Sequence, residues 1–168
     1  MNLWLLRHAK TVPDPPPGKT DHERPLAARG RRDADALARQ LEDDRLGFRP
    51  RDLPKLVLCS TAVRTVQTAE RVLPGLGDPP VEYRRALYNA TPDDVIDELR
   101  ALDDELDTVM VVGHNPTAQA LSVSMEKKRD ERRTFPTCAL AVYRLPAKKW
   151  LEVDQGTGTL LGLFSPPY

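Results

Sequence analysis

The chain has 168 residues, of which 40% are hydrophobic and 30% charged, with 25 basic side chains balanced by 25 acidic ones. This length predicts one domain, spanning residues 1–168, with a sizeable core. A formal charge of zero gives no global attraction to nucleic acid or acidic lipid, so neither is an expected partner. The early apolar run over residues 3–6 is too short for a signal peptide or a membrane span.

The cysteine and histidine content argues against a disulfide framework and a metal centre. Cys59 and Cys138 lie far apart and form no C-x-x-C pair, so a reducing cytoplasm is the expected location. The three histidines form no H-E-x-x-H motif and no close pair. We therefore expect no metal and no cofactor.

The first part of the chain predicts a strand, a loop and a helix. Residues 3–6 (LWLL) form a short buried strand that stops at the polar pair Arg7 and His8. The prolines over residues 12–25 predict a loop, because proline fixes φ and lacks an N–H donor. A helix follows, since apolar residues recur at helical spacing. They are Ala34, Leu37, Ala38 and Leu41.

A second strand and helix are predicted next. Residues 56–59 (LVLC) form a buried strand, and Ser60 or Thr61 is expected to cap the following helix. The expected apolar face of that helix consists of Ala62, Val66, Ala69 and Leu73. An alternating strand is predicted over residues 81–87, after a pair of prolines.

From residue 91 the sequence predicts a helix, a third buried strand and another helix. Residues 91–94 (TPDD) supply a threonine cap, a proline at the first position and an acid at the third. Residues 108–112 (TVMVV) form the strand, which ends at residues 113–116 (GHNP). The last helix is indicated by Ala118, Leu121 and Met125.

The C-terminal part predicts a charged loop over residues 126–136 and a closing hairpin. The hairpin is expected to pair residues 138–145 with residues 150–153, ahead of a glycine- and proline-rich tail. Strands that alternate with helices predict one α/β domain with a largely parallel sheet. Continuous apolar strands indicate that both faces of this sheet are covered.

Polar residues follow three of the predicted strands. Arg7 and His8 follow the first strand, Arg64 lies in the first turn after the second, and His114 and Asn115 follow the third. Ligands of open α/β sheets bind beyond the carboxyl ends of the strands. Arginine recognises oxyanions through two parallel hydrogen bonds, and helix N-termini attract anions. The pattern predicts a phosphoryl site with two imidazoles close enough to react.

Each of these residues also has a structural interpretation. A single histidine such as His8 or His114 is more often a surface residue or one whose hydrogen bonds are satisfied within the fold. A site is favoured only because both histidines end apolar strands at the same edge of the sheet. Arg64 has the alternative of a solvated helix position. His22 is expected at the surface, with a place in the lining of the pocket as the minority interpretation. The basic cluster within residues 127–133 is interrupted by acids and is expected to be a solvated loop, with docking of an acidic partner as the minority interpretation.

Three segments resemble the motifs of the histidine phosphatase superfamily, which has the phosphoglycerate mutase-like fold. Residues 6–10 (LRHAK) are similar to its R-H-G signature, residues 59–69 (CSTAVRTVQTA) to its S-x-x-x-R-x-x-Q-T-A motif, and residues 112–115 (VGHN) to its third motif. Further matches resemble the SixA-like phosphohistidine phosphatases. These are Asp21, residues 24–26 (RPL), Arg29, Gly30, Leu87, Tyr88, Pro136 and Thr137.

The resemblance implies a three-layer α/β/α sandwich on a mostly parallel mixed sheet and a role for each motif residue. His8 would be the nucleophile that becomes phosphorylated. Arg7 and Arg64 would hold the phosphoryl oxygens, and His114 would stabilise the charge on the transferring group. Asn115 would also contact the phosphate, together with the N–H groups at the start of the helix that follows it. No metal is implied, because the arginines supply the positive charge.

The sequence departs from the superfamily pattern at two places. Ala9 replaces the glycine that usually follows the histidine, a change that SixA-like members also tolerate. Many superfamily members carry a glutamate proton donor in the region of Tyr88, but residues 84–89 (RRALYN) contain no carboxylate. Tyr88, or a carboxylate that no motif matches, remains an alternative proton donor.

The missing glutamate favours a phosphorus–nitrogen substrate. An alkoxide leaving group has a conjugate acid with a pKa near that of water, about 15.7, and needs a proton in the transition state. Phosphohistidine leaves as imidazole, whose conjugate acid has a pKa of about 6.5. We therefore expect a monomeric phosphohistidine phosphatase that acts on a phosphohistidine-containing phosphorelay protein.

Two other functions stay open from the sequence. One is a small-molecule phosphomonoesterase or mutase of the same superfamily, which a carboxylate in the pocket would favour. The other is a phosphoprotein-binding module without turnover, against which the pair His8 and His114 argues.

Overall fold

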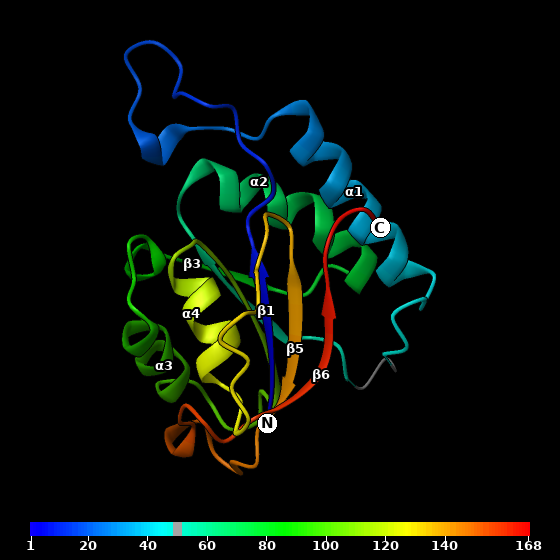
Figure 1. The fold of residues 1–168 in the computed structure, drawn as a ribbon, viewed down its shortest axis with the longest axis vertical. Helices are drawn as coiled ribbons and strands as arrows, with labels where there is room; N and C mark the ends of the chain where they lie inside the picture. Colours follow the sequence, from blue (N-terminus) through cyan, green and yellow to red (C-terminus); the bar gives the residue numbers. More distant parts are fainter. Residues whose placement is uncertain (49–51) are drawn as a thin grey trace.

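A computed structural model describes residues 1–48 and 52–168 of the chain. Its six-stranded sheet has the order β3-β2-β4-β1-β5-β6 (Figure 1). The strands are β1 (Asn2–Arg7), β2 (Leu56–Ser60), β3 (Val81–Arg84), β4 (Thr108–Gly113), β5 (Leu140–Arg144) and β6 (Thr159–Phe164). The first four run parallel, β5 pairs antiparallel with β1, and β6 pairs antiparallel with β5 at the edge of the sheet. The predicted mixed, mostly parallel sheet is confirmed.

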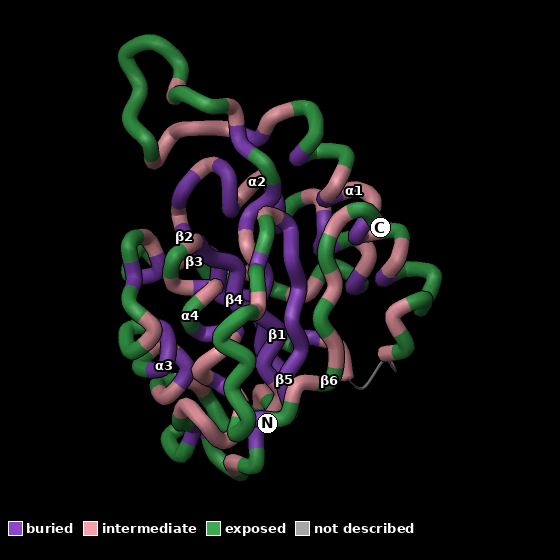
Figure 2. The backbone as a smooth tube through the Cα atoms, viewed as in Figure 1, coloured by how far each residue is buried: buried purple, intermediate pink, exposed green. Residues whose placement is uncertain are grey.

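Helices cover both faces of the sheet, so the fold is a three-layer α/β/α sandwich. The helices are α1 (Ala28–Glu42), α2 (Val63–Val72), α3 (Pro92–Arg100) and α4 (Thr117–Ser124). Successive side chains of a strand point to opposite faces. Trp4 and Leu6 of β1 accordingly join the core under α1 and α2, whereas Leu3 and Leu5 join the core under α3 and α4. The tube in Figure 2 shows the central strands buried.

Several predicted elements are confirmed. Thr91 caps α3: its hydroxyl accepts from the Asp94 N–H at 3.2 Å, while the Asp94 carboxylate accepts from the Thr91 N–H at 2.7 Å. The proline loop over residues 12–25 is a loop with one 3-10 turn at Asp21–Glu23, and it stands exposed at one end of the molecule (Figure 2). Among the described residues, no helix combines the length and the apolar character needed to cross a bilayer.

The predicted closing hairpin is wrong in its second strand. Residues 150–152 form a 3-10 turn (Trp150–Glu152), and β5 pairs with β6 from the tail instead. β6 is the edge strand of the sheet, and its positions alternate between exposed and half-buried. Its residues belong to the glycine- and proline-rich tail, where the sequence predicts no strand. The strand predicted over residues 81–87 is also shorter, since the chain turns into a 3-10 helix at Arg85–Leu87.

The start of α2 differs from the prediction, and its buried face is wider than the predicted one. The capping position is Ala62, with no side-chain cap, rather than Ser60 or Thr61. The buried residues of the helix are Arg64, Thr65, Thr68, Ala69 and Val72. The two threonine hydroxyls are satisfied locally: Thr65 donates to the Ser60 carbonyl at 2.8 Å, and Thr68 donates to the Arg64 carbonyl at 2.6 Å. Of the predicted apolar face, Ala62, Ala69 and Leu73 are buried and Val66 is half-buried, so the two threonines add to that face.

The start of α1 holds the segment that follows β1. Gly30 packs so closely on this segment that a Cβ there would lie 2.0 Å from the Lys10 carbonyl oxygen. The Ala27 N–H donates to the same oxygen at 2.9 Å. On the β1 side, the His8 N–H donates to the Gly113 carbonyl at 3.0 Å. The backbone around His8 is thus fixed from both sides.

Candidate active site

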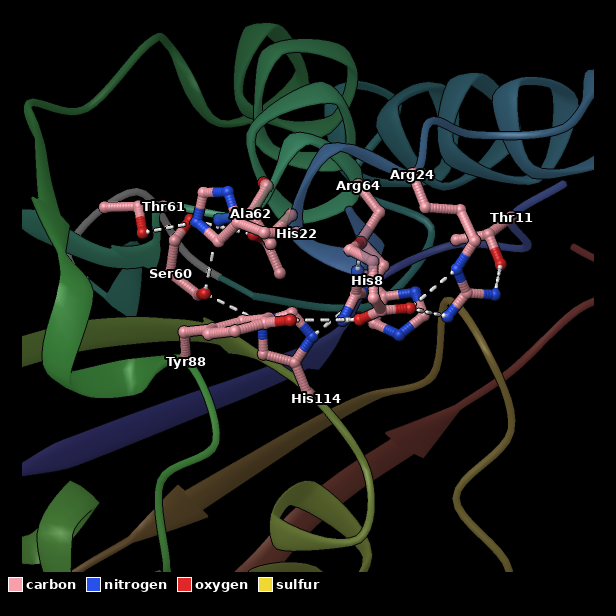
Figure 3. A network of polar contacts seen from close by, with 12 residues as sticks. His8, Thr11, His22, Arg24, Ser60, Thr61, Ala62, Arg64, Tyr88 and His114 are labelled. Carbon is pink, nitrogen blue, oxygen red and sulfur yellow. Dashed lines mark hydrogen bonds and ion pairs between the residues drawn. The ribbon is translucent and has the colours of Figure 1, made fainter. Parts of the chain in front are cut away.

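A cavity of about 710 Å³ opens at the carboxyl ends of β1, β2 and β4. Its lining includes all five residues that the sequence predicts for the site: Arg7, His8, Arg64, His114 and Asn115. The imidazoles of His8 and His114 lie with their ring centroids 5.4 Å apart. The fold therefore brings the two predicted histidines together at the carboxyl ends of the strands (Figure 3).

His8 is buried and its neutral tautomer is set by the backbone. Its Nδ1 lies 2.8 Å from the Ala9 carbonyl oxygen, which accepts a hydrogen bond and cannot donate one. The proton of the neutral ring therefore belongs on Nδ1, which leaves the lone pair on Nε2. Burial lowers the pKa of His8 to about 4, and the charges of Arg64, Arg7 and Arg24 act in the same direction against the Ala9 bond. Burial lowers the pKa of His8 more than the neighbouring arginines do.

His114 is held between a cation and a hydroxyl. Its Nδ1 accepts from the Arg64 Nε–H at 3.2 Å, so its proton lies on Nε2 and is donated to the Ser60 Oγ at 2.7 Å. Burial lowers the pKa of His114 to about 3, with smaller contributions from His8 and Arg64. Both ring nitrogens are engaged, so His114 orients Arg64 in this arrangement.

Arg64 is bound to a carboxylate from the proline loop. Its two terminal nitrogens donate to Asp21, one to the main-chain oxygen at 2.8 Å and one to Oδ2 at 3.1 Å. Asp21 also accepts from Arg24 Nε at 3.0 Å and from the Tyr88 hydroxyl at 3.1 Å. Partial burial pulls the pKa of Asp21 up, but Arg64, Tyr88 and Arg24 hold it below its usual range. The cavity thus contains a carboxylate that stays ionised at neutral pH.

Arg7 and Asn115 lie on the other side of the cavity. The Arg7 guanidinium donates to the Phe135 carbonyl at 2.9 Å, and its buried Nε has no partner within the described residues. The Asn115 amide donates to the same carbonyl at 3.4 Å, and its oxygen accepts from the Gln119 N–H at 3.2 Å. Asn115 therefore closes the N-terminus of α4, which starts at the cavity.

Some contacts of the site could not be read from the sequence. Ser60 is expected as a helix cap and as the serine of the second motif, and the structure shows it fully buried and hydrogen-bonded to His114. His22 was expected at the surface, but it is half-buried, 2.9 Å from the Thr61 hydroxyl and edge-on to the Tyr88 ring at 4.8 Å. The expected general-acid region is occupied by Tyr88, as the sequence indicates, and its hydroxyl donates to Asp21. These contacts join residues dozens of positions apart.

The basic segment over residues 127–133 is a loop, as predicted, but one of its cations is not solvated. Arg133 is almost buried, and its guanidinium pairs with Glu126 and donates to the Ser122 carbonyl. This residue ties the loop to α4. Within residues 1–48 and 52–168, no group of three His, Cys, Asp or Glu side chains is placed to hold a metal ion.

The pKa of His8 gives a pH prediction. Between about pH 5 and pH 8 His8 is neutral, so kcat/KM for a reaction that uses its free lone pair should be flat there and should fall as the ring protonates near pH 4. Both imidazoles have pKa values below the value of 6.5 that applies to the unfolded chain. Under acid conditions the unfolded state therefore binds more protons than the folded state, and the free energy of unfolding falls as the pH drops below 6.5. Initial rates and melting curves measured at the same pH values separate the protonation of His8 from the loss of stability. A midpoint near 6.5 in folded protein would contradict this environment for His8.

The comparison with known proteins identifies the class. The sequence model of the histidine phosphatase superfamily (branch 1) matches residues 3–91. An uncharacterized protein of Mycobacterium tuberculosis strain H37Rv is 36% identical over 173 residues, covering 96% of this chain and 99% of the relative. The chain therefore belongs to the histidine phosphatase superfamily, and it is a phosphatase by class.

Within that superfamily, the chain resembles the SixA structures. A protein described as a candidate phosphohistidine phosphatase SixA from Nakamurella multipartita superposes with a TM-score of 0.79 at 29% identity, covering 99% of this chain and 96% of that one. The protein histidine phosphatase SixA in complex with tungstate has a TM-score of 0.78 at 25% identity, covering 99% and 97%. The resemblance extends over the whole fold described above.

Proposed function

We propose that the protein is a metal-independent phosphohistidine phosphatase that works through a phosphorylated His8, with residues 1–168 acting as one domain. The observation that carries the proposal is the state of His8. Its ring is neutral, its proton is fixed on Nδ1 by the Ala9 carbonyl, and its remaining lone pair is on Nε2 in a cavity lined by arginines. A nucleophile needs such a lone pair, and covalent catalysis divides the reaction into two easier displacements.

In the first step, Nε2 of His8 attacks the phosphorus of a substrate phosphohistidine. A bond forms between Nε2 and phosphorus while the substrate phosphorus–nitrogen bond breaks. The leaving imidazole takes that electron pair and already carries a proton on its other nitrogen, so no proton moves. Nucleophile and leaving group are the same chemical group, and the step is close to balanced in energy. Arg7 and Arg64 hold the equatorial oxygens, since phosphoryl transfer mainly requires positioning and charge stabilisation.

In the second step, water attacks the phosphorus of phospho-His8. The bond to Nε2 breaks and its electron pair returns to the ring, which keeps its Nδ1 proton on the Ala9 carbonyl. Both protons of the water leave with the product as dihydrogen phosphate. The start of α4 adds little here, because the Asn115 side chain accepts from the Gln119 N–H and the His114 carbonyl accepts from the Ala118 N–H. Contact of His114 with a phosphoryl oxygen requires its ring to release Arg64 or Ser60.

The carboxylate in the cavity does not replace the glutamate that the sequence lacks. Asp21 lies next to Tyr88, in the region where the superfamily places its proton donor. Its lowered pKa keeps it ionised at neutral pH, so it has no proton to give to an alkoxide. This favours phosphohistidine over a phosphate monoester. We propose a cytoplasmic phosphohistidine-containing protein of a phosphorelay as the substrate.

Phosphate release from two substrates tests this proposal. A phosphohistidine-bearing protein and p-nitrophenyl phosphate are compared at equal concentration, each with and without EDTA. We expect a much larger kcat/KM for the phosphohistidine protein and no change in EDTA, because the arginines supply the positive charge. Faster turnover of the ester would overturn the substrate class. Loss of activity in EDTA, restored by a divalent cation, would overturn the metal-independent mechanism.

A small-molecule phosphomonoesterase or mutase is the second candidate. The cavity of about 710 Å³ is larger than a phosphoryl group requires, and the carboxylate of Asp21 lies inside it. Neutral polar side chains also line the cavity: Asn89, Thr91, Thr117 and Thr137. A panel of sugar phosphates and nucleotides in the same assay separates the two candidates.

A further inference from the structure

Asp21 occupies positions around Arg64 that resemble those of a bound oxyanion. Its Oδ2 lies 3.1 Å from an Arg64 terminal nitrogen and 3.1 Å from the Tyr88 hydroxyl. Its Oδ1 lies 3.0 Å from the Nε and 2.9 Å from a terminal nitrogen of Arg24. A carboxylate has about four lone-pair directions, and these four donors fill them. The protein therefore places an anion of its own between two guanidinium groups.

A phosphoryl group and this carboxylate need the same cation. The Arg64 side chain is 7% exposed and is fixed at Nε by His114, so it cannot turn toward a separate anion. The Asp21 side chain is 53% exposed and belongs to the short turn within the proline loop, so it is the partner that can move. Like charges this close repel one another, and binding of a phosphate anion has to overcome that repulsion or displace the carboxylate.

We propose that Asp21 is an internal anion that competes with phosphate for Arg64 and thereby discriminates against small free phosphate species. The inference rests on the proposed function, because it takes the cavity as the phosphoryl site. A phosphorylated protein contacts the surface around the cavity as well as Arg64, and those contacts offset the displacement of Asp21. Inorganic phosphate has no such additional contacts, so the carboxylate returns to Arg64 and the product leaves.

The variant Asp21→Asn removes the charge and leaves the rest of the arrangement in place. The Arg64 Nε bond to His114 and its 2.8 Å bond to the Asp21 main-chain oxygen do not depend on the carboxylate. An asparagine oxygen can still accept from one guanidinium. A positioning role for the charge predicts weaker anion binding in the variant, whereas competition predicts tighter binding. The direction of the change in Kd thus distinguishes the two roles.

Calorimetric titration with inorganic phosphate at neutral pH is the direct test. We expect Asp21→Asn to bind phosphate on the order of tenfold more tightly than wild type, because a like charge beside the anion is gone. Its KM for p-nitrophenyl phosphate should fall in parallel. Asp14→Asn is the matched control, since Asp14 is an exposed carboxylate of the same loop and should leave the Kd unchanged. Melting curves check the fold, and Asp21→Ser provides a second neutral variant.

The outcomes separate this inference from the proposed function. If wild type binds phosphate and Arg64→Ala weakens that binding, but both Asp21 variants bind equally or more weakly, the competition is wrong and the phosphoryl site stands. If phosphate binding is unaffected by Arg64→Ala, the cavity is not the phosphoryl site and the proposed function fails. Equal tightening in Asp14→Asn would show a general charge effect and would also overturn the role of Asp21.

Discussion

The variant His8→Ala is expected to lose phosphate release completely, with kcat lowered on the order of 10⁴-fold or more, as for other enzymes that lose their nucleophile. The physical reason is that the phosphoryl group would have no acceptor in the cavity. The neighbouring His114 cannot substitute, because its nitrogens are engaged by Arg64 and Ser60. Initial rates with the phosphohistidine protein measure the effect.

The control for this variant is His22→Ala. His22 lies near the site, but it contacts Thr61 and the Tyr88 ring and does not line the cavity. We expect it to retain most of the wild-type rate. Turnover that survives in His8→Ala, in protein whose melting temperature matches wild type, would remove His8 as the nucleophile.

The second large effect is expected for Arg64→Ala, with kcat/KM lowered about 10²–10³-fold, the cost typical of losing one oxyanion-stabilising donor. Arg64 is the cation with the most specific placement, since His114 and Asp21 fix both ends of its guanidinium. Arg64→Lys keeps a charge but loses the planar fork, so we expect intermediate activity. Steady-state kinetics on the three proteins provide the comparison.

Arg71→Ala is the matched control for the arginine series. Arg71 lies on the same helix α2 and pairs with Asp35 at 2.9 Å, away from the cavity. Its removal should cost at most a little stability, as is usual for exposed ion pairs, and leave the rate unchanged. Equal losses in the Arg64 and Arg71 variants would indicate damage to the helix and would contradict a direct role for Arg64.

The central strands and the polar residues at their carboxyl ends could be predicted because both depend on local sequence signals. The apolar strands β1, β2 and β4 are continuous runs, and the cap at Thr91 is a local pattern of residue types. The polar residues that end these strands follow from the same runs. The convergence of Arg7, His8 and His114 on one cavity therefore required only the parallel arrangement of the strands.

The predictions are wrong or incomplete where contacts between distant segments determine the structure. β6 lies in a tail whose glycines and prolines favour a loop, and its pairing with β5 outweighs that local signal. Thr65 and Thr68 look solvent-facing in sequence, but local hydrogen bonds to the backbone let them be buried. The contacts of Asp21 with Arg64 and of Ser60 with His114 span 43 and 54 positions, and no local pattern encodes them.

Trapping the phosphorylated enzyme tests the central claim most directly. The protein is mixed briefly with a radiolabelled phosphohistidine protein, quenched, and digested into peptides. The account predicts label on the peptide that contains His8, lost in acid and retained in alkali, as expected for a phosphoramidate. Tight substrate binding without any label would indicate a phosphoprotein-binding module, and label that persists in His8→Ala would place the intermediate elsewhere; either result contradicts the account.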